Sequence, residues 1–299
     1  MNAQPWQREF DGAIAAVREA ALLARELRDR FGERVFKADR SPVTVADFAV
    51  QAVVAERLRQ AFPGDSLVAE EDSAALRRAE NRLIRRAVLD ALHGHVSGLS
   101  PDRLLDVIDR DRGVPASRFW TLDPVDGTQA VHSRRSVRGR AGACRRRTRG
   151  DWTAGCPALA SPEQPREAVG GIACAVRNQG AFRQLLTGGE YMPLHVSSRR
   201  FPSNARILRS FEGDHIDLPA FNRVVEALHV DEPPRLVDSQ AKHALIAAGQ
   251  ADLVLRIPAS PAYRDKIWDQ AAGTLIVEEA GGRVTDLDGV PSTSGADAC

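Results

Sequence analysis

Asp123-Pro124-Val125-Asp126-Gly127-Thr128 is the stretch of this sequence that decides its fold, and it directly follows the apolar run Phe119-Trp120-Thr121-Leu122. Two acids, a proline, a glycine and a threonine in this order are hard to explain as a turn alone. The proline stiffens the turn, and the glycine lets the backbone come close to a ligand. The start of the next helix can hold a phosphate group. The stretch therefore predicts a metal and phosphate site at the end of a strand.

Three further acids stand where an apolar element stops or a helix starts. Asp47 ends Val43-Thr44-Val45-Ala46-Asp47, Glu70 follows the run 66–69 and begins Glu70-Glu71-Asp72, and Asp269 follows Ile267-Trp268. Mg²⁺ prefers carboxylate, carbonyl and water oxygens in an octahedral arrangement. A single acid in such a place is more often a cap or turn residue than a metal ligand. The combination, however, predicts a shared magnesium cleft.

The hydrophobic pattern predicts helices and strands that alternate along the chain. Apolar residues recur at helical spacing over 8–31 and 45–62, with Ser41 or Thr44 as the N-cap of the second helix and Pro63-Gly64 ending it. Residues 66–69 and 119–122 are expected to form strands. After about residue 161 the pattern indicates a second α/β unit, with strands expected near 205–208, 253–257 and 283–285.

Composition excludes several classes of protein. The 299 residues carry 41 basic and 40 acidic side chains, a net charge of +1, which argues against a general binder of nucleic acids or of membrane surfaces. The four cysteines form no CxxC pair. Acids stand early in the chain, so we expect no signal peptide, and no apolar run approaches a membrane span. These features predict a soluble, reduced, cytoplasmic monomer.

The motifs resemble those of the lithium-sensitive inositol monophosphatase family. The resemblance lies in the stretch 123–128, in Ala69-Glu70-Glu71-Asp72, and in Trp268-Asp269-Gln270-Ala271-Ala272-Gly273. The segments 41–47, 238–242 and 266–269 are similar to those of its 3′(2′),5′-bisphosphate nucleotidase branch, which acts in sulfur metabolism and converts adenosine 3′,5′-bisphosphate to AMP. The implied fold combines α+β and α/β halves in a layered αβαβα sandwich of the inositol monophosphatase and fructose-1,6-bisphosphatase type.

The resemblance also implies roles for single residues around Mg²⁺. Glu70, Asp123 and the Val125 carbonyl would hold one ion, and Asp123, Asp126 and Asp269 a second, while Asp47 and Glu70 would serve a third. Asp47 and Thr128 would polarise the attacking water. Phosphoryl transfer independently needs a water in line with the leaving oxygen, cations on the developing charge, and a path for the proton.

For the substrate, the resemblance points to a small nucleoside bisphosphate. Its contacts would be Gly127, Thr128, His215, Ser239, Lys242 and Arg256. A lysine and an arginine facing one cleft suit a second phosphate, although without the resemblance both would read as surface charge. His195 and His243 are expected to be structural. The alternatives are a phosphatase of inositol phosphates or polyphosphates and a catalytically impaired family member.

We expect an N-terminal α+β domain over 1–165, carrying most metal ligands, and a C-terminal α/β domain over 166–299. Two segments depart from the family pattern. Residues 129–150 are rich in arginine, lack acids and show neither helical nor strand periodicity, and 292–299 show no pattern either. Both are compatible with a shifted reading frame. Arginines in place of an apolar strand cannot be buried unpaired, so a shifted chain would be poorly folded and weakly active.

Overall fold

The computed structural model describes residues 6–31, 45–109, 118–125, 144–146, 152–154, 170–210, 216–237, 240–260 and 262–291, with side chains for all of these except 28–31, 144–146 and 152–154. Its helices are α1 (Gln7–Phe31), α2 (Val45–Ala61), α3 (Ala74–Arg77), α4 (Arg82–Ala91), α5 (Pro101–Ile108), α6 (Leu218–Ala227), α7 (Ala241–Ala247) and α8 (Ile267–Glu279). Short 3₁₀ turns lie at Ala79–Asn81 and Pro202–Asn204.

Two sheets run through the described part of the chain. The larger has seven strands in sequence order: β1 (Ser66–Ala69), β2 (Phe119–Leu122), β3 (Cys144–Arg146), β4 (Trp152–Ala154), β5 (Gly171–Val176), β6 (Gly180–Leu185) and β7 (Gly188–Leu194). The pair β1–β2 is parallel, and each later pair is antiparallel. The smaller sheet is parallel, in the order β10 (Leu253–Val254), β8 (Ile207–Arg209), β9 (Arg235–Leu236).

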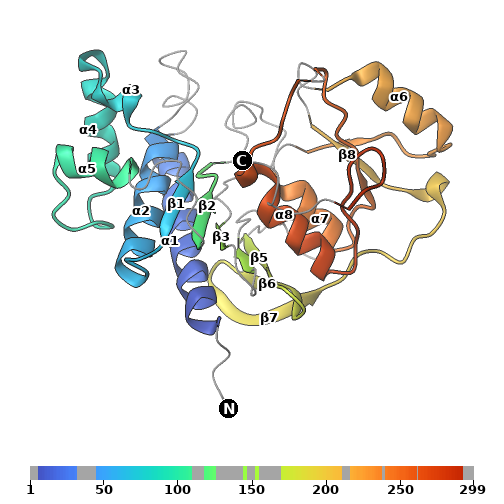
Figure 1. Cartoon of the computed structure of the whole chain (residues 1–299), viewed down its shortest axis with the longest axis horizontal. Coiled ribbons are helices and arrows are strands. Elements are labelled where there is room, and N and C mark those ends of the chain that lie inside the picture. Colours follow the sequence, from blue (N-terminus) through green and yellow to red (C-terminus); the bar gives the residue numbers. More distant parts are fainter. Residues whose placement is uncertain are drawn as a thin grey trace.

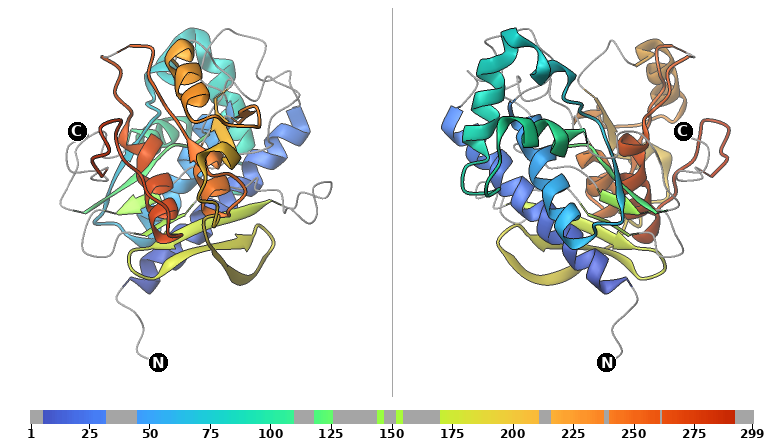
Figure 2. Two further views of the ribbon diagram at one scale, coloured as in Figure 1. Left: turned by 90° about the vertical axis from the view of Figure 1, so that its right-hand side faces the viewer. Right: turned by 60° about the vertical axis from the view of Figure 1, so that its left-hand side comes forward.

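These elements stack as alternating helical and sheet layers, which confirms the expected αβαβα sandwich. Figure 1 shows α1 and α2 on one side of the large sheet and α7 and α8 on the other, with the small sheet and α6 beyond; Figure 2 shows the same order from two other sides. Strand β5 lies between two cores because its side chains alternate. Ile172, Cys174 and Val176 join the core with α1 and α2, and Ala173 and Ala175 join the core with α7 and α8.

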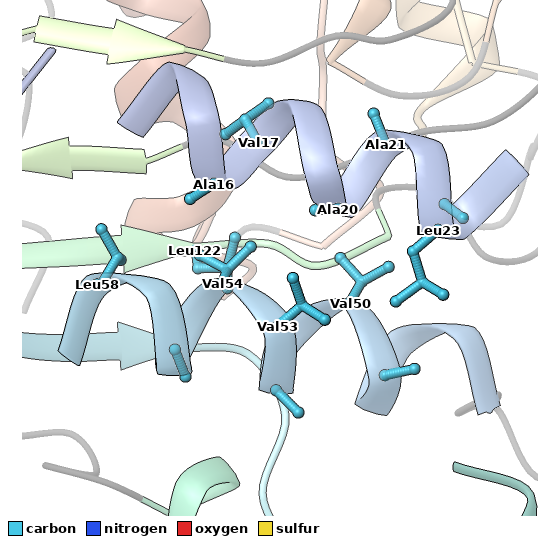
Figure 3. Close-up of a cluster of buried hydrophobic side chains, with 14 of the residues drawn as sticks. Ala16, Val17, Ala20, Ala21, Leu23, Val50, Val53, Val54, Leu58 and Leu122 are labelled. Atoms are coloured by element: carbon cyan, nitrogen blue, oxygen red, sulfur yellow. The ribbon is translucent and has the colours of Figure 1, made fainter. Parts of the chain in front are cut away.

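Helix α2 is buried on nearly every side, and its sequence from Val45 to Ala55 is apolar except for Asp47 and Gln51. It packs between α1 and the pair α4 and α5. Small side chains of α1, such as Ala16 and Ala20, face Val50 and Val53 of α2 (Figure 3), and such small residues let two helices approach closely. The polar residues of α2 that face this interior must therefore have a structural or functional partner.

The structure confirms the first helix over 8–31, the second over 45–62 to within one residue, and both strands 66–69 and 119–122. The expected N-caps at 41 and 44 lie outside the described residues. The expected strand over 283–285 is wrong: Thr285 forms only a single bridge with Pro291. Residues 129–150 were expected to lack a strand, but Cys144–Arg146 pairs with β2 and β4, since backbone hydrogen bonds can form a strand without apolar alternation.

The expected domain boundary near residue 165 lies outside the described residues. Strands β5, β6 and β7 follow that boundary in sequence, yet they continue the large sheet that begins with β1. Their two tight turns use left-handed backbone conformations, at Asn178 (φ 61°) and at Gly188 and Gly189 (φ 97° and 104°). Within the described residues, no helix combines the length and apolar character that crossing a membrane requires.

Candidate active site

Two of the expected metal ligands follow neighbouring parallel strands at the same edge of the large sheet. Ala69 and Leu122 are paired in the β1–β2 register, so Glu70 and Asp123 are the next residues on adjacent strands. The Glu70 N–H donates to the Leu122 carbonyl at 3.1 Å, which extends the ladder to the acid itself. Adjacent strands lie about 4.8 Å apart, so this register brings the two residues side by side. Asp123 is 4 % exposed, whereas Glu70 is exposed.

Asp47 reaches the same acidic region from the first turn of α2, where its side chain is almost completely buried. The pKa of Glu71 reflects the acidic side chains that lie near it. Burial, followed by the charges of Asp47, Glu70 and Asp72, raises this pKa to about 8. Four carboxyl groups therefore act on one another electrostatically, although they come from two separate segments of the chain.

Helix α8 packs against the same two strands and carries Asp269 in its first turn. Its first residues, Ile267 and Trp268, pack with Val68 of β1 and Phe119 of β2 in one apolar cluster. Asp269 stands in the first turn and accepts a hydrogen bond from the Lys266 N–H at 2.9 Å. A carboxylate at a helix N-terminus is stabilised by the helix dipole.

The donor chemistry of this region fits Mg²⁺. Hard carboxylate oxygens are present in it, and a bound cation would relieve their mutual repulsion. Val125, whose carbonyl is the expected ligand, is buried two residues after Asp123. Among the described residues, no three His, Cys, Asp or Glu side chains form a complete site. Asp126, Gly127 and Thr128 lie outside the described residues.

Lys242 lies on α7 and is buried, which is unusual for a lysine. Its ammonium donates to the Ser210 hydroxyl at 2.8 Å and to the Val237 carbonyl at 3.2 Å. These contacts fix the direction of a side chain that would otherwise be mobile. Lys242 is therefore not the ordinary surface lysine that was the alternative to a substrate contact. The other expected nucleotide contacts, Ser239 and His215, lie outside the described residues.

Arg256 is exposed but held on one side by Tyr263 and Asp265. Its guanidinium donates to the Tyr263 hydroxyl at 2.8 Å, lies 5.5 Å from the centre of that ring, and pairs with Asp265 at 2.8 Å. The pKa of Tyr263 is raised, chiefly by burial and in part by Asp265 and Asp269, while Arg256 opposes this shift. The charges of Arg256 and of Asp269, the last expected metal ligand, therefore both act on Tyr263.

His243 is affected by the charges of the two cationic side chains and packs against α8. Its pKa is lowered to about 4, first by burial and then by the charges of Lys242 and Arg256. Its ring lies against Gly273, where an added Cβ would come within 2.4 Å of the imidazole. The ring is therefore a neutral packing element between α7 and α8, in line with the structural role expected for it. Sequence patterns did not indicate the contact between Tyr263 and Arg256, because Tyr263 belongs to no run of acids.

Comparison with known proteins gives a consistent result over nearly the whole chain. Residues 6–131 and 153–299 match the model of the inositol monophosphatase family. The match leaves out 132–152, which includes all but the first three residues of the arginine-rich departure expected over 129–150, but it extends through 292–299, where a departure was also expected.

Relatives and solved structures agree with this match. The chain is 33 % identical to 3′(2′),5′-bisphosphate nucleotidase 1 of Candida albicans, covering 97 % of this chain and 88 % of the relative. It is 35 % identical to the corresponding enzyme 1 of Arabidopsis thaliana, over 92 % and 84 %. Mycobacterium tuberculosis SuhB has a similar fold, with a TM-score of 0.62 at 21 % identity over 97 % and 91 % of the two chains. CysQ of Bacteroides thetaiotaomicron gives 0.59 at 18 % identity, over 93 % and 88 %.

Proposed function

The chain belongs to the inositol monophosphatase family, and on that basis we propose that it is a magnesium-dependent phosphatase that hydrolyses the 3′-phosphate of adenosine 3′,5′-bisphosphate to give AMP. The observation that carries the proposal is the register of β1 and β2, which sets Glu70 beside Asp123. Asp47 in the first turn of α2 and Asp269 in the first turn of α8 would complete the same acidic edge.

In this proposal the carboxylates divide among three ions. Glu70, Asp123 and the Val125 carbonyl would hold one, Asp123, Asp126 and Asp269 a second, and Asp47 and Glu70 a third. When bound, Mg²⁺ would neutralise charge that develops on the phosphoryl oxygens and make water more acidic. The buried environment of Asp47 and Asp123 would strengthen these charge interactions, because water screens them less there.

The chain's own residues would orient the attacking water and accept its proton. The water oxygen forms a bond to phosphorus as the bond from phosphorus to the 3′-oxygen breaks, which yields phosphate and a free 3′-hydroxyl. Thr128 would accept a hydrogen bond from this water and pass a proton towards Asp47, and the leaving oxygen takes up a proton from solvent. Gly127 would let the backbone approach the phosphate.

The remaining 5′-phosphate and nucleoside would lie towards the cationic side of the site. Lys242 and Arg256 both act electrostatically on His243, so their positive charges occupy one neighbourhood. An arginine suits bidentate phosphate binding, and a lysine supplies a point charge. Ser239 and His215 would add further contacts. The names of the relatives agree with a nucleotide substrate.

Phosphate release by the purified chain tests this function. We expect faster release from adenosine 3′,5′-bisphosphate than from inositol 1-phosphate, no release in EDTA, and inhibition by Li⁺ at fixed Mg²⁺. Preference for inositol 1-phosphate would contradict the proposed substrate but would leave the assignment as a phosphatase unchanged. Activity that survives EDTA would contradict the magnesium assignment.

One observation favours a second candidate, a catalytically impaired family member. The family match stops at residue 131, directly after the Asp126-Gly127-Thr128 stretch, and resumes only at 153. An altered segment there would disturb the acidic edge more than any other part of the site. Binding of Mn²⁺ or nucleotide without turnover would support this candidate.

A further inference from the structure

Helix α2 carries a completely buried glutamine, Gln51, whose side chain reaches the acidic segment after β1. Its Nε2 donates to the Glu71 carbonyl at 2.7 Å, and its Oε1 accepts from the Glu71 N–H at 3.0 Å. The amide thus pairs with both backbone polar groups of one residue, as a neighbouring strand would. The same Nε2 also lies 3.3 Å from the carbonyl of Ile108, the last residue of α5.

The position of Gln51 links two proposed metal ligands. It follows Asp47 by four residues on one helix, so the two side chains project from the same side of α2, one turn apart. Its partner Glu71 directly follows Glu70. Between Asp47 and Glu70 there are therefore only one turn of a buried helix, one pair of hydrogen bonds and one peptide unit. None of these parts is a flexible side chain at the surface.

The acidic segment is fastened at its other end as well. The carboxylate of Asp109 accepts from the Ser73 N–H at 2.8 Å and from Arg77 at 2.8 Å. Glu70 itself is fixed to β2 through the Leu122 carbonyl. Carboxyl groups that repel one another tend to move apart unless the backbone prevents it. Here the backbone is held at residues 70, 71 and 73, and the contact at 71 is the one made by α2.

We propose that Gln51 is a positioning residue of the phosphatase site: it fixes the backbone at Glu71 to helix α2 and thereby sets the separation of Asp47 and Glu70. The inference rests on the proposed function, because it assumes that these two acids serve a common cation. It adds a residue that would touch neither metal nor substrate. The benefit is preorganisation, since a site held open in advance costs less to fill.

The test compares Gln51→Met with Gln184→Met. Gln184 is the matched control because it is also a buried glutamine (9 % exposed), donates to the Gly189 carbonyl at 2.6 Å and accepts from Arg18, but lies on β6 among other partners. A milder variant, Gln51→Asn, keeps the amide but shortens its reach. Mn²⁺ affinity is measured without substrate by electron paramagnetic resonance, together with the melting temperature and the Mg²⁺ concentration for half-maximal phosphate release.

We expect Gln51→Met to weaken Mn²⁺ binding about tenfold, which corresponds to about 1.4 kcal/mol. Gln51→Asn should weaken it less, and Gln184→Met should bind like the parent even where its melting temperature falls as far. At saturating Mg²⁺ the KM for nucleotide should change less than twofold.

Equal Mn²⁺ affinity in Gln51→Met and the parent would overturn the inference, as would an equal loss in the control. If Gln51→Met does not fold, Gln51→Asn decides by the same comparison. A parent that binds Mn²⁺ but releases no phosphate would contradict the proposed function and leave the role of Gln51 to be judged by affinity. A parent that binds no Mn²⁺ would overturn both.

Discussion

The two ends of helix α2 place acidic side chains in opposite surroundings. Near its C-terminal end, Glu56 is 1 % exposed and bonded to Arg59 at 2.6 Å and to Arg103 at 3.0 Å. Its pKa is lowered to about 2, chiefly because Arg59 donates to it. At the N-terminal end, Asp47 and its neighbours instead help to raise the pKa of Glu71 to about 8. The acid that supports the fold is paired with arginines, whereas the acids proposed as metal ligands lie among other acids.

The largest expected effect comes from removing one charge at the N-terminal end. Asp47→Asn should lower kcat about 10³-fold, because losing a group that holds metal and takes a proton costs about 4 kcal/mol in the transition state. Its melting temperature in EDTA should equal or exceed that of the parent, since like-charge repulsion is reduced. Phosphate release and thermal unfolding measure the two effects.

The control is Asp90→Asn, which changes an exposed acid paired with Arg86 and should alter neither quantity. A marked fall in the melting temperature of Asp47→Asn would break the comparison, because it would make Asp47 a structural acid like Glu56.

A change in the segment that the family match leaves out should have the next largest effect. Replacing residues 132–152 by the corresponding segment of the Candida albicans relative should raise kcat at least ~10-fold and raise the melting temperature, because an apolar strand would replace arginines that cannot be buried unpaired. Unchanged activity would show that the departure leaves the acidic edge intact. Sequencing the source gene checks the cause: if restoring one or two bases does not recover apolar segments at 129–150 and 292–299, the shifted frame is excluded.

A change near the C-terminal end of α2 should lower the unfolding free energy and hardly affect kcat. Glu56→Gln should cost about 2 kcal/mol of unfolding free energy, because it leaves two partly exposed arginines without their buried carboxylate. The pKa of Glu56 is lower in the folded chain than the ordinary 4.5. Its contribution is therefore complete above pH 4.5 and disappears as the pH falls towards 2.

Urea unfolding of parent and variant from pH 7 to pH 2.5 measures this difference. The gap between them should close over the acidic half of that range, and the exposed Glu226→Gln serves as the control with a change within about 0.5 kcal/mol. If the difference in unfolding free energy between parent and variant stays constant with pH, the ion pair is not the cause of that difference.

The smallest expected effect concerns Arg256, which does not fall clearly on either side of the comparison between structural and functional charges. Arg256 is already paired with Asp265, yet we propose that it also contacts substrate. Tyr263→Phe removes the hydroxyl that Arg256 donates to but keeps the ring, so the KM for nucleotide should rise about fivefold, as one lost hydrogen bond implies. The other tyrosine provides the control, Tyr191→Phe, whose KM should not change. An unchanged KM in both would assign Arg256 to structure, as for the arginines at Glu56.

Sequence patterns predicted the parts of this fold that depend on side-chain periodicity. The two long helices and the strands 66–69 and 119–122 were found because each has a clear apolar pattern next to a polar boundary. The hairpins of β5 to β7 were missed, since their signal lies in turn residues such as Asn178 and Gly188. Of the site, the acids at strand ends could be predicted. Gln51 could not, because its importance lies in a contact with the backbone of a residue twenty positions away.

The contact between His243 and Gly273 has a consequence for inhibitor design. There is no room for even a methyl group between the His243 ring and Gly273, so α7, which carries Lys242, packs closely against α8, which carries Asp269. Under the proposed function, a compound that carries an anionic group for Lys242 and a metal-chelating group for the acidic edge should therefore work best with a stiff linker of one length. Since His243 stays neutral above pH 4 or so, that length should serve unchanged across the neutral range.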